Sequence, residues 1–185
     1  MSRLDISTWP CSVARAVAVT SDRWTPLIMR DAFYGLTRFE QFQTNLGMSR
    51  NVLTRRLNSI VEVGLLERRK YQDRPVRHEY IVTDMGRDYW KVVAAMATWS
   101  DTWLSGDHGP PVVLHHDTCG HETSARLVCA HCKNELELDD VSATLGPGYP
   151  DQLKPEAKAT GFLREPGRHH PPQRPAPNTS APQQH

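Results

Sequence analysis

The stretch from Met48 to Val82 constrains the fold most strongly, because a helical hydrophobic pattern is followed directly by a basic hairpin pattern. In a helix that begins at Ser49, whose hydroxyl can cap the first turn, Leu53, Leu57 and Ile60 share one face, which must be buried. Amide, hydroxyl and guanidinium groups occupy the opposite face, on Asn51, Thr54, Arg55 and Asn58. Such groups are suited to hydrogen bonds with base edges and phosphates.

The segment after this helix has the pattern of a two-stranded hairpin. Gly64 ends the helix, and Glu67–Tyr71 and His78–Val82 are predicted strands around a turn that Asp73 and Pro75 favour. Three basic side chains of the hairpin would lie along a sugar-phosphate backbone or enter a minor groove, namely Lys70, Arg74 and Arg77.

Three shorter helices are predicted before it, over Cys11–Thr20, Trp24–Tyr34 and Arg38–Leu46, and Gly47 separates the last of them from the helix at Ser49. Two helices joined by a tight glycine-containing link form a helix-turn-helix, and a basic hairpin after the second helix is the wing of a winged helix. The predicted fold class is therefore mainly α with a small β wing.

Charge is concentrated in the same part of the chain. The whole chain has a formal net charge of +1, but residues 38–77 carry nine Lys and Arg against four Asp and Glu, a local excess of +5. Local clustering of this kind is the electrostatic footprint of a phosphate-binding surface.

A final helix, capped by Thr83, is predicted to carry a stripe of large apolar residues at alternating spacings of four and three. The stripe consists of Met85, Tyr89, Val92, Met96, Trp99 and Trp103. One interpretation is a helix that faces its own core. The other is a dimerisation helix, because a stripe that ends in two tryptophans exceeds what a small winged-helix core can cover.

Residues 11–104 resemble an HxlR-type winged helix-turn-helix regulator, a bacterial and archaeal group related to the MarR type. The resemblance rests on residues 11–15, 22–42, 49–69 and 77–86 in combination, and its departures at Ser12 and Pro26 lie away from the DNA side. It implies a dimeric transcription factor, more often a repressor, whose fourth helix enters the major groove and whose first and last helices form the dimer. Two-fold symmetry then implies a palindromic operator with half-sites about one helical turn apart.

The expected contacts to double-stranded DNA come from the helix at Ser49 and from the hairpin. The candidate residues are Ser49, Arg50, Asn51, Thr54, Arg55, Asn58, Lys70, Arg74 and Arg77. Two alternatives remain: an ordinary solvated helix face, or a winged helix that binds a protein and never touches DNA.

Cys11 is a candidate redox sensor. It stands just before a predicted helix, where the positive end of the helix dipole favours the reactive thiolate. Some HxlR-type regulators sense electrophiles or oxidants through a cysteine at this position. The alternative is an inert, buried thiol beside the dimer interface.

Residues 112–140 contain a second candidate site. The residues His116, Cys119, Cys129 and Cys132 form two pairs with two-residue spacing, as in a zinc ribbon that closes a tetrahedral structural site. Competing ligands are His115, His121 and His131. One alternative is a small appendage with reduced thiols. Another is a zinc or thiol enzyme built on the three cysteines, but the sequence near them lacks a nucleophile paired with a general base. The chain is therefore not expected to be an enzyme, and structural Zn²⁺ is the one candidate cofactor.

The predicted organisation is an N-terminal arm (1–10), the winged helix-turn-helix domain (11–104), the Cys- and His-containing appendage (112–140) and a disordered tail (146–185). The tail holds nine of the chain's fourteen prolines and too little apolar surface to fold. The N-terminus lacks the pattern of a signal peptide and no apolar run could span a bilayer, so a cytoplasmic protein is expected.

Overall fold

The structure is a computed structural model that describes residues 5–20 and 22–159. The chain divides into two compact units, Met1–Arg126 and Leu127–His185. Their boundary falls inside the predicted appendage at 112–140. The predicted domain scheme itself stays a prediction.

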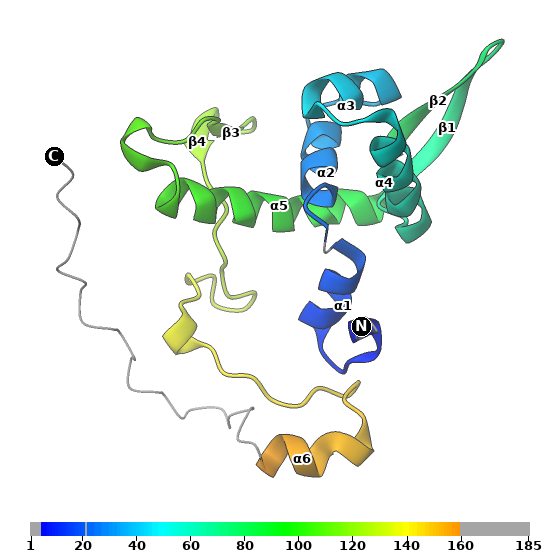
Figure 1. The fold of residues 1–185 in the computed structure, drawn as a ribbon. Helices are drawn as coiled ribbons and strands as arrows, with labels where there is room; N and C mark the ends of the chain where they lie inside the picture. The colour runs from blue at the N-terminus through cyan, green and yellow to red at the C-terminus, as the bar shows by residue number, and fades with distance from the viewer. Residues whose placement is uncertain (1–4, 21, 160–185) are drawn as a thin grey trace, which may run out of the picture. The chain divides into compact units, whose positions relative to one another are not determined.

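The first unit contains the winged helix-turn-helix, and the fold class predicted from the sequence is confirmed (Figure 1). Its elements in chain order are η1 (Ile6–Thr8), α1 (Ser12–Thr20), α2 (Thr25–Phe33), α3 (Phe39–Leu46), α4 (Arg50–Val63), β1 (Leu66–Asp73), β2 (Val76–Val82), α5 (Asp84–Trp103), η2 (Gly106–His108), β3 (Leu114–His116) and β4 (His121–Thr123). Both sheets are two-stranded and antiparallel.

The core forms where α2, α3 and α4 meet the base of the β1–β2 hairpin. Leu53, Leu57 and Ile60 are buried, as the periodicity of α4 predicts. They pack with buried residues of the neighbouring elements, including Ile28, Met29, Phe42, Leu66 and Tyr80. The inner face of α4 is thereby fixed, and its polar face is turned outward.

Glycines end the two helices of the helix-turn-helix. Gly47 after α3 and Gly64 after α4 have φ of 61° and 89°, the left-handed conformation that glycine adopts without a Cβ penalty. The expected hydroxyl cap on α4 is wrong: Ser49 is the N-cap residue, but its side chain makes no cap hydrogen bond. Instead, the Ser49 carbonyl accepts from the Leu53 N–H at 3.0 Å, so the backbone begins the helix without the hydroxyl.

The start of α5 is tied to the end of α4. The Thr83 hydroxyl accepts from the Gly86 N–H at 3.0 Å, which confirms the predicted cap, and the Thr83 N–H donates to the Leu65 carbonyl at 3.2 Å. Gly86 lies so close to Leu65 that a Cβ built on it would be 2.1 Å from the Leu65 carbonyl oxygen. Within residues 5–20 and 22–159, no helix is long and apolar enough to cross a membrane, and this includes the 20-residue α5.

The second unit contains short elements, η3 (Leu138–Asp140), η4 (Asp151–Leu153) and α6 (Lys154–Ala159). The helical turns over 151–159 lie in the segment expected to be disordered. Pro155 is compatible with them because it stands in the first turn of α6, where proline's missing N–H has no helical partner. The rest of the predicted tail, residues 160–185, lies outside the described residues.

Candidate nucleic-acid interface

The outward side of α4 is an exposed polar surface. A shallow hollow of about 500 Å³ runs along it, lined by the four residues that the sequence predicts, Asn51, Thr54, Arg55 and Asn58, and by two that it does not, Ser59 and Glu62. All four predicted residues are exposed, whereas Leu53 and Leu57 on the opposite side are fully buried. This helix therefore presents hydrogen-bonding groups on a rigid base.

Two further contacts organise the first turns of α4. The Arg50 guanidinium lies 5.1 Å from the centre of the Phe39 ring of α3, a cation–π contact that holds Arg50 beside the helix-turn-helix link. The Thr54 hydroxyl donates to the Arg50 carbonyl at 2.8 Å. Thr54 has therefore used its hydroxyl proton within the helix and remains available mainly as an acceptor and through its methyl group.

Arg56 belongs to the basic cluster but not to the polar face. Its guanidinium lies 3.3 Å from the Asp22 carboxylate, and the Arg56 side chain is only 28% exposed. Asp22 in turn accepts from the Thr25 N–H at 3.0 Å at the start of α2. The pair therefore connects α4 to the start of α2. One of the nine positive charges in residues 38–77 thus forms an ion pair within the fold.

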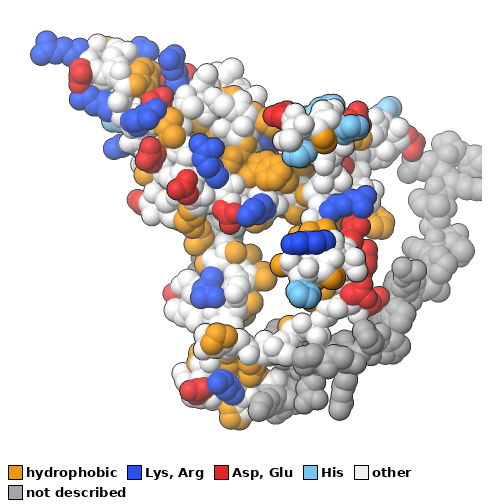
Figure 2. Space-filling model, turned by 180° about the vertical axis from the view of Figure 1, so that it is seen from behind, with side chains coloured by type: hydrophobic (Ala, Val, Ile, Leu, Met, Phe, Trp, Pro, Cys, Tyr) orange, Lys and Arg blue, Asp and Glu red, His pale blue; other side chains and the backbone are white. Residues whose placement is uncertain are grey.

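The β1–β2 hairpin forms the predicted wing, and Figure 2 shows Lys and Arg side chains gathered on this hairpin. Some of these charges are paired: Lys70 with Asp73, and Arg69 with Glu79 at 2.9 Å. Arg74 and Arg77 are exposed, and neither forms an ion pair within the described residues. These two guanidiniums are thus the free charges of the predicted wing set.

Glu62 is the charged one of the two lining residues that the sequence pattern did not identify. It lies one turn beyond Asn58 and lines the same hollow, so the polar face is not free of acid at its C-terminal end. Extending the helical periodicity by one more turn would have found it. A carboxylate there can accept from a cytosine amino group but repels phosphate.

The apolar stripe of α5 is largely uncovered in the single chain. Met85, Val92, Met96, Trp99 and Trp103 are 54%, 49%, 50%, 60% and 72% exposed. Tyr89 differs, because it is half-buried and packs against the core, where burial raises the pKa of its hydroxyl. Helix α1 also leaves apolar side chains exposed, since it buries none of its residues and Val13 is 71% exposed.

Cys11 is a free, partly exposed thiol immediately before α1, as the sequence predicts. Its carbonyl accepts from the Arg15 N–H at 3.1 Å, the first hydrogen bond of the helix. Cys11 therefore directly precedes the unsatisfied N–H groups at the start of a nine-residue helix.

The two Cys and His pairs of the appendage each form a tight turn. In the first unit, the His116 carbonyl accepts from the N–H groups of Cys119 and Gly120, and the Cys119 sulfur lies 3.4 Å from His116 Nδ1. In the second unit, the Cys129 carbonyl accepts from the Lys133 N–H, and Lys133 takes a left-handed φ of 65°. Hydrogen bonds from the backbone of Cys132 and His131 lower the pKa of the Cys129 thiol.

A zinc-ribbon appendage is not seen. Across residues 5–20 and 22–159, no three His, Cys, Asp or Glu side chains lie close enough together to hold a metal ion. The zinc site at His116, Cys119, Cys129 and Cys132 therefore stays a prediction.

The fold, the exposed α4 face and the basic wing define a winged helix-turn-helix of the transcription-regulator class. The profile of the HxlR-like helix-turn-helix family matches residues 19–108. The uncharacterized HTH-type transcriptional regulator Rv3095 of Mycobacterium tuberculosis (strain ATCC 25618 / H37Rv) is 43% identical over 142 residues, 77% of this chain and 90% of that protein. The chain belongs to the HxlR-like helix-turn-helix family.

Two solved structures match a longer part of this chain than its winged helix. PA1607, assigned as a transcription factor, has a TM-score of 0.69 and 32% identity over 75% of this chain and 96% of its own. PA1374 of Pseudomonas aeruginosa, also assigned as a transcription factor, has a TM-score of 0.58 and 35% identity over 79% and 99%. The match to Rv3095 covers 142 residues of this chain, so even if it began at residue 1 it would reach residue 142. The similarity to Rv3095 therefore includes the appendage at 112–140.

Proposed function

We propose that this DNA-binding transcription regulator acts as a homodimeric repressor that reads a palindromic operator with the polar face of α4. The observation that carries the proposal is the division of α4 into a fully buried apolar side and an exposed side of Asn51, Thr54, Arg55 and Asn58. A helix supported in this way can enter the major groove without losing its own packing.

The wing supplies the sequence-independent part of the binding energy. Arg74 and Arg77 are exposed and unpaired by carboxylates in the described part of the chain, so each can neutralise a phosphate and release a counterion. Arg50, placed over Phe39 at the start of α4, can contact the phosphate at the groove edge. The backbone contacts would then fix the register in which α4 meets the bases.

A second copy of the chain is the proposed partner of the α5 stripe. Five exposed large apolar side chains on one helix are more than a monomeric surface ordinarily leaves in contact with water. A two-fold axis beside α5 would bury the same stripe on both protomers and place two copies of α4 on one side of the dimer. The assignment as a repressor rests on the family resemblance.

Selection from a pool of random DNA duplexes tests this proposal. The full-length protein is expected to enrich an inverted repeat whose half-sites are separated by about one helical turn, roughly 10 base pairs. Failure to enrich any sequence at low salt would instead favour the protein-interaction winged helix. The side of α4 that lines the hollow argues against that alternative, because Glu62 is its one acid.

Removing a wing charge should change the salt dependence of DNA binding. For Arg74→Ala or Arg77→Ala we expect the slope of log affinity against log salt to fall in magnitude by about 1, on every DNA sequence. Fluorescence anisotropy titrations at several salt concentrations measure the slope. Lys70→Ala is the internal comparison, because Lys70 is already paired with Asp73 and should change the slope less. An unchanged slope in both Arg variants would remove the wing from the interface.

We further propose that Cys11 makes DNA binding responsive to electrophiles. The support is its position, partly exposed and directly before α1, whose apolar residues are as uncovered as those of α5. A modified thiol there would disturb α1 at the proposed dimer interface. Treating wild-type protein with N-ethylmaleimide is expected to weaken operator binding at least tenfold, whereas Cys11→Ser should not respond. An equal loss in both proteins would exclude Cys11 as the sensor and assign the effect to another cysteine.

A further inference from the structure

Strand β1 of the wing contains a β-bulge at Tyr71. The pairing register shifts between Lys70 and Gln72, so Tyr71 between them has no partner on β2. Bulges re-aim a side chain, and they are over-represented next to functional sites. Here the Tyr71 ring, which is 37% exposed, lies 5.1 Å from the Arg38 guanidinium in a cation–π contact.

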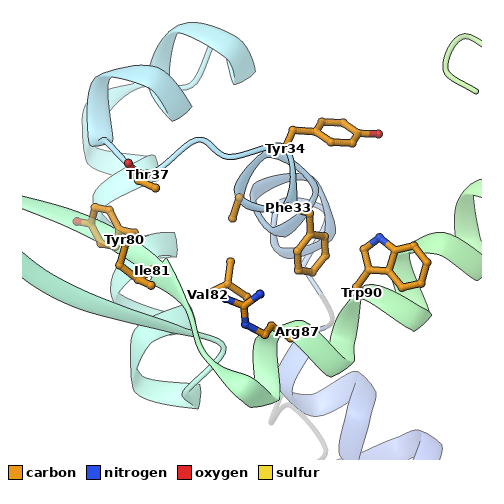
Figure 3. A pocket seen from close by; sticks show the side chains of 9 residues that line it. Phe33, Tyr34, Thr37, Tyr80, Ile81, Val82, Arg87 and Trp90 are labelled. Carbon is orange, nitrogen blue, oxygen red and sulfur yellow. The ribbon is translucent and has the colours of Figure 1, made fainter. Parts of the chain in front are cut away.

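The backbone of Arg38 is also fixed. Arg38 is the N-cap residue of α3, and it forms an isolated antiparallel bridge with Glu79 of β2. One residue earlier, the Tyr80 N–H donates to the Thr37 carbonyl at 2.7 Å, and Figure 3 shows Thr37 and Tyr80 side by side. Both the main chain and the side chain of Arg38 are therefore held where the wing joins the helix-turn-helix.

The charge of Arg38 is not neutralised within the fold. Its side chain is exposed, and in residues 5–20 and 22–159 no carboxylate forms an ion pair with its guanidinium. Glu79, its bridge partner, is paired with Arg69 instead, at 2.9 Å. A planar guanidinium without a carboxylate partner is suited to bind a phosphate through two hydrogen bonds.

A second guanidinium with the same kind of support lies beside the start of α3. Phe39 directly follows Arg38, and the Arg50 guanidinium lies 5.1 Å from the centre of its ring. Arg50 is exposed too, and no ion pair involves it in the part of the chain that the structure describes. Aromatic support limits the motion of both side chains, so each loses less freedom when it binds an anion.

We propose that Arg38 and Arg50 form a clamp on the phosphate backbone of one DNA strand, with Tyr71 as the positioning residue of Arg38. The ligand of the clamp is a phosphodiester, so the clamp adds affinity and fixes the register of α4 without reading bases. The inference rests on the proposed function, because it adds a contact to the DNA interface proposed above.

Anisotropy titrations of the full-length protein with its selected operator, at several salt concentrations, test the role of Arg38. For Arg38→Ala we expect the slope of log affinity against log salt to fall in magnitude by about 1 per protomer. Arg38→Lys should keep the slope, because it keeps the charge.

Arg23→Ala is the matched control for these titrations. Arg23 is also exposed and also lies over an aromatic ring, that of Trp24 at 6.0 Å, but it stands between α1 and α2 in the chain. The control should keep the wild-type slope. An Arg38→Ala slope equal to that of the control would overturn the assignment of Arg38.

Substitutions of Tyr71 test its positioning role. Tyr71→Phe retains the ring and should bind the operator as wild type does, whereas Tyr71→Ala should weaken binding about two- to fivefold with an unchanged salt slope. In the Arg38→Ala background, Tyr71→Ala should have no further effect. A further loss in that background, or full affinity of Tyr71→Ala alone, would overturn the positioning role.

Uncharged methylphosphonate linkages, placed one position at a time in both half-sites of the operator, locate the contact. Replacing the phosphate that Arg38 binds should weaken wild-type binding, but Arg38→Ala should bind that duplex as it binds the unmodified operator. Equal losses in wild type and Arg38→Ala at every linkage would overturn the clamp while the proposed function stands. Failure of the wild-type protein to bind any duplex would overturn the proposed function together with the clamp.

Discussion

Replacing Trp99 and Trp103 by glutamate is expected to separate the dimer while leaving the winged helix folded. Both side chains are mostly exposed in the single chain, at 60% and 72%, so the fold loses little packing. In a symmetric dimer each substitution occurs twice, and buried interface tryptophans commonly contribute about 2 kcal/mol or more each. The four tryptophans of the dimer together correspond to about 8 kcal/mol, so we expect the dimer dissociation constant to rise roughly 10⁵- to 10⁶-fold.

Sedimentation equilibrium measures this change directly. The wild-type chain should sediment at twice its mass of 21.0 kDa, and the double variant at its own mass at micromolar concentration. Operator affinity should fall steeply when the dimer dissociates, because a monomer bound to one half-site makes only half of the contacts that the dimer makes. Lys91→Glu is the matched control, since it adds acid to an exposed site of α5 outside the stripe. If the double variant remained a dimer, the interface would lie elsewhere.

Gly86→Ala should have the largest effect on the stability of the fold. A Cβ there would be 2.1 Å from the Leu65 carbonyl oxygen and 2.9 Å from a Val82 methyl carbon. The carbonyl belongs to the backbone, which the Leu65 N–H also anchors to the Ile60 carbonyl at 3.1 Å, so it cannot turn aside as a side chain could. Such overpacking costs roughly 3 kcal/mol, more than the helix propensity that alanine gains over glycine, which is about 1 kcal/mol.

Urea unfolding followed by circular dichroism gives the difference in the free energy of unfolding. Gly146→Ala is the matched control, because no atom lies within 4 Å of a Cβ built there and its φ is ordinary. The control should leave the unfolding midpoint within experimental error. A Gly86→Ala protein as stable as wild type would mean that α5 does not approach Leu65 as closely as the structure places it.

Local sequence pattern was sufficient to predict the elements of the winged helix. The helix predicted over Trp24–Tyr34 spans Thr25–Phe33, and the one predicted to start at Ser49 and end at Gly64 spans Arg50–Val63. Burial of Leu53, Leu57 and Ile60 follows from their spacing alone. These features depend on neighbours within one or two turns, and such neighbours can be read from the sequence.

Features that depend on long-range packing could not be predicted in this way. Arg56 counts as a phosphate-binding charge in the sequence, but it is paired with Asp22, which is distant in the chain. Tyr89 fits the apolar stripe by spacing, yet it turns toward the core where α5 packs on α2. The contact between Arg38 and Tyr71 likewise joins two elements that no local pattern brings together.

Arg55→Ala tests whether the outward face of α4 reads bases. Arg55 is exposed and lines the hollow of α4, and a bidentate contact from such a side chain to a base is worth about 1–3 kcal/mol. The measurement is the affinity of wild-type and Arg55→Ala protein for the selected operator and for every single-base variant of one half-site. We predict a loss of affinity for the operator together with relaxed discrimination at one position. An equal loss on all sequences, with discrimination unchanged at every position, would mean that Arg55 contacts only the DNA backbone and that this face of α4 does not read bases through it.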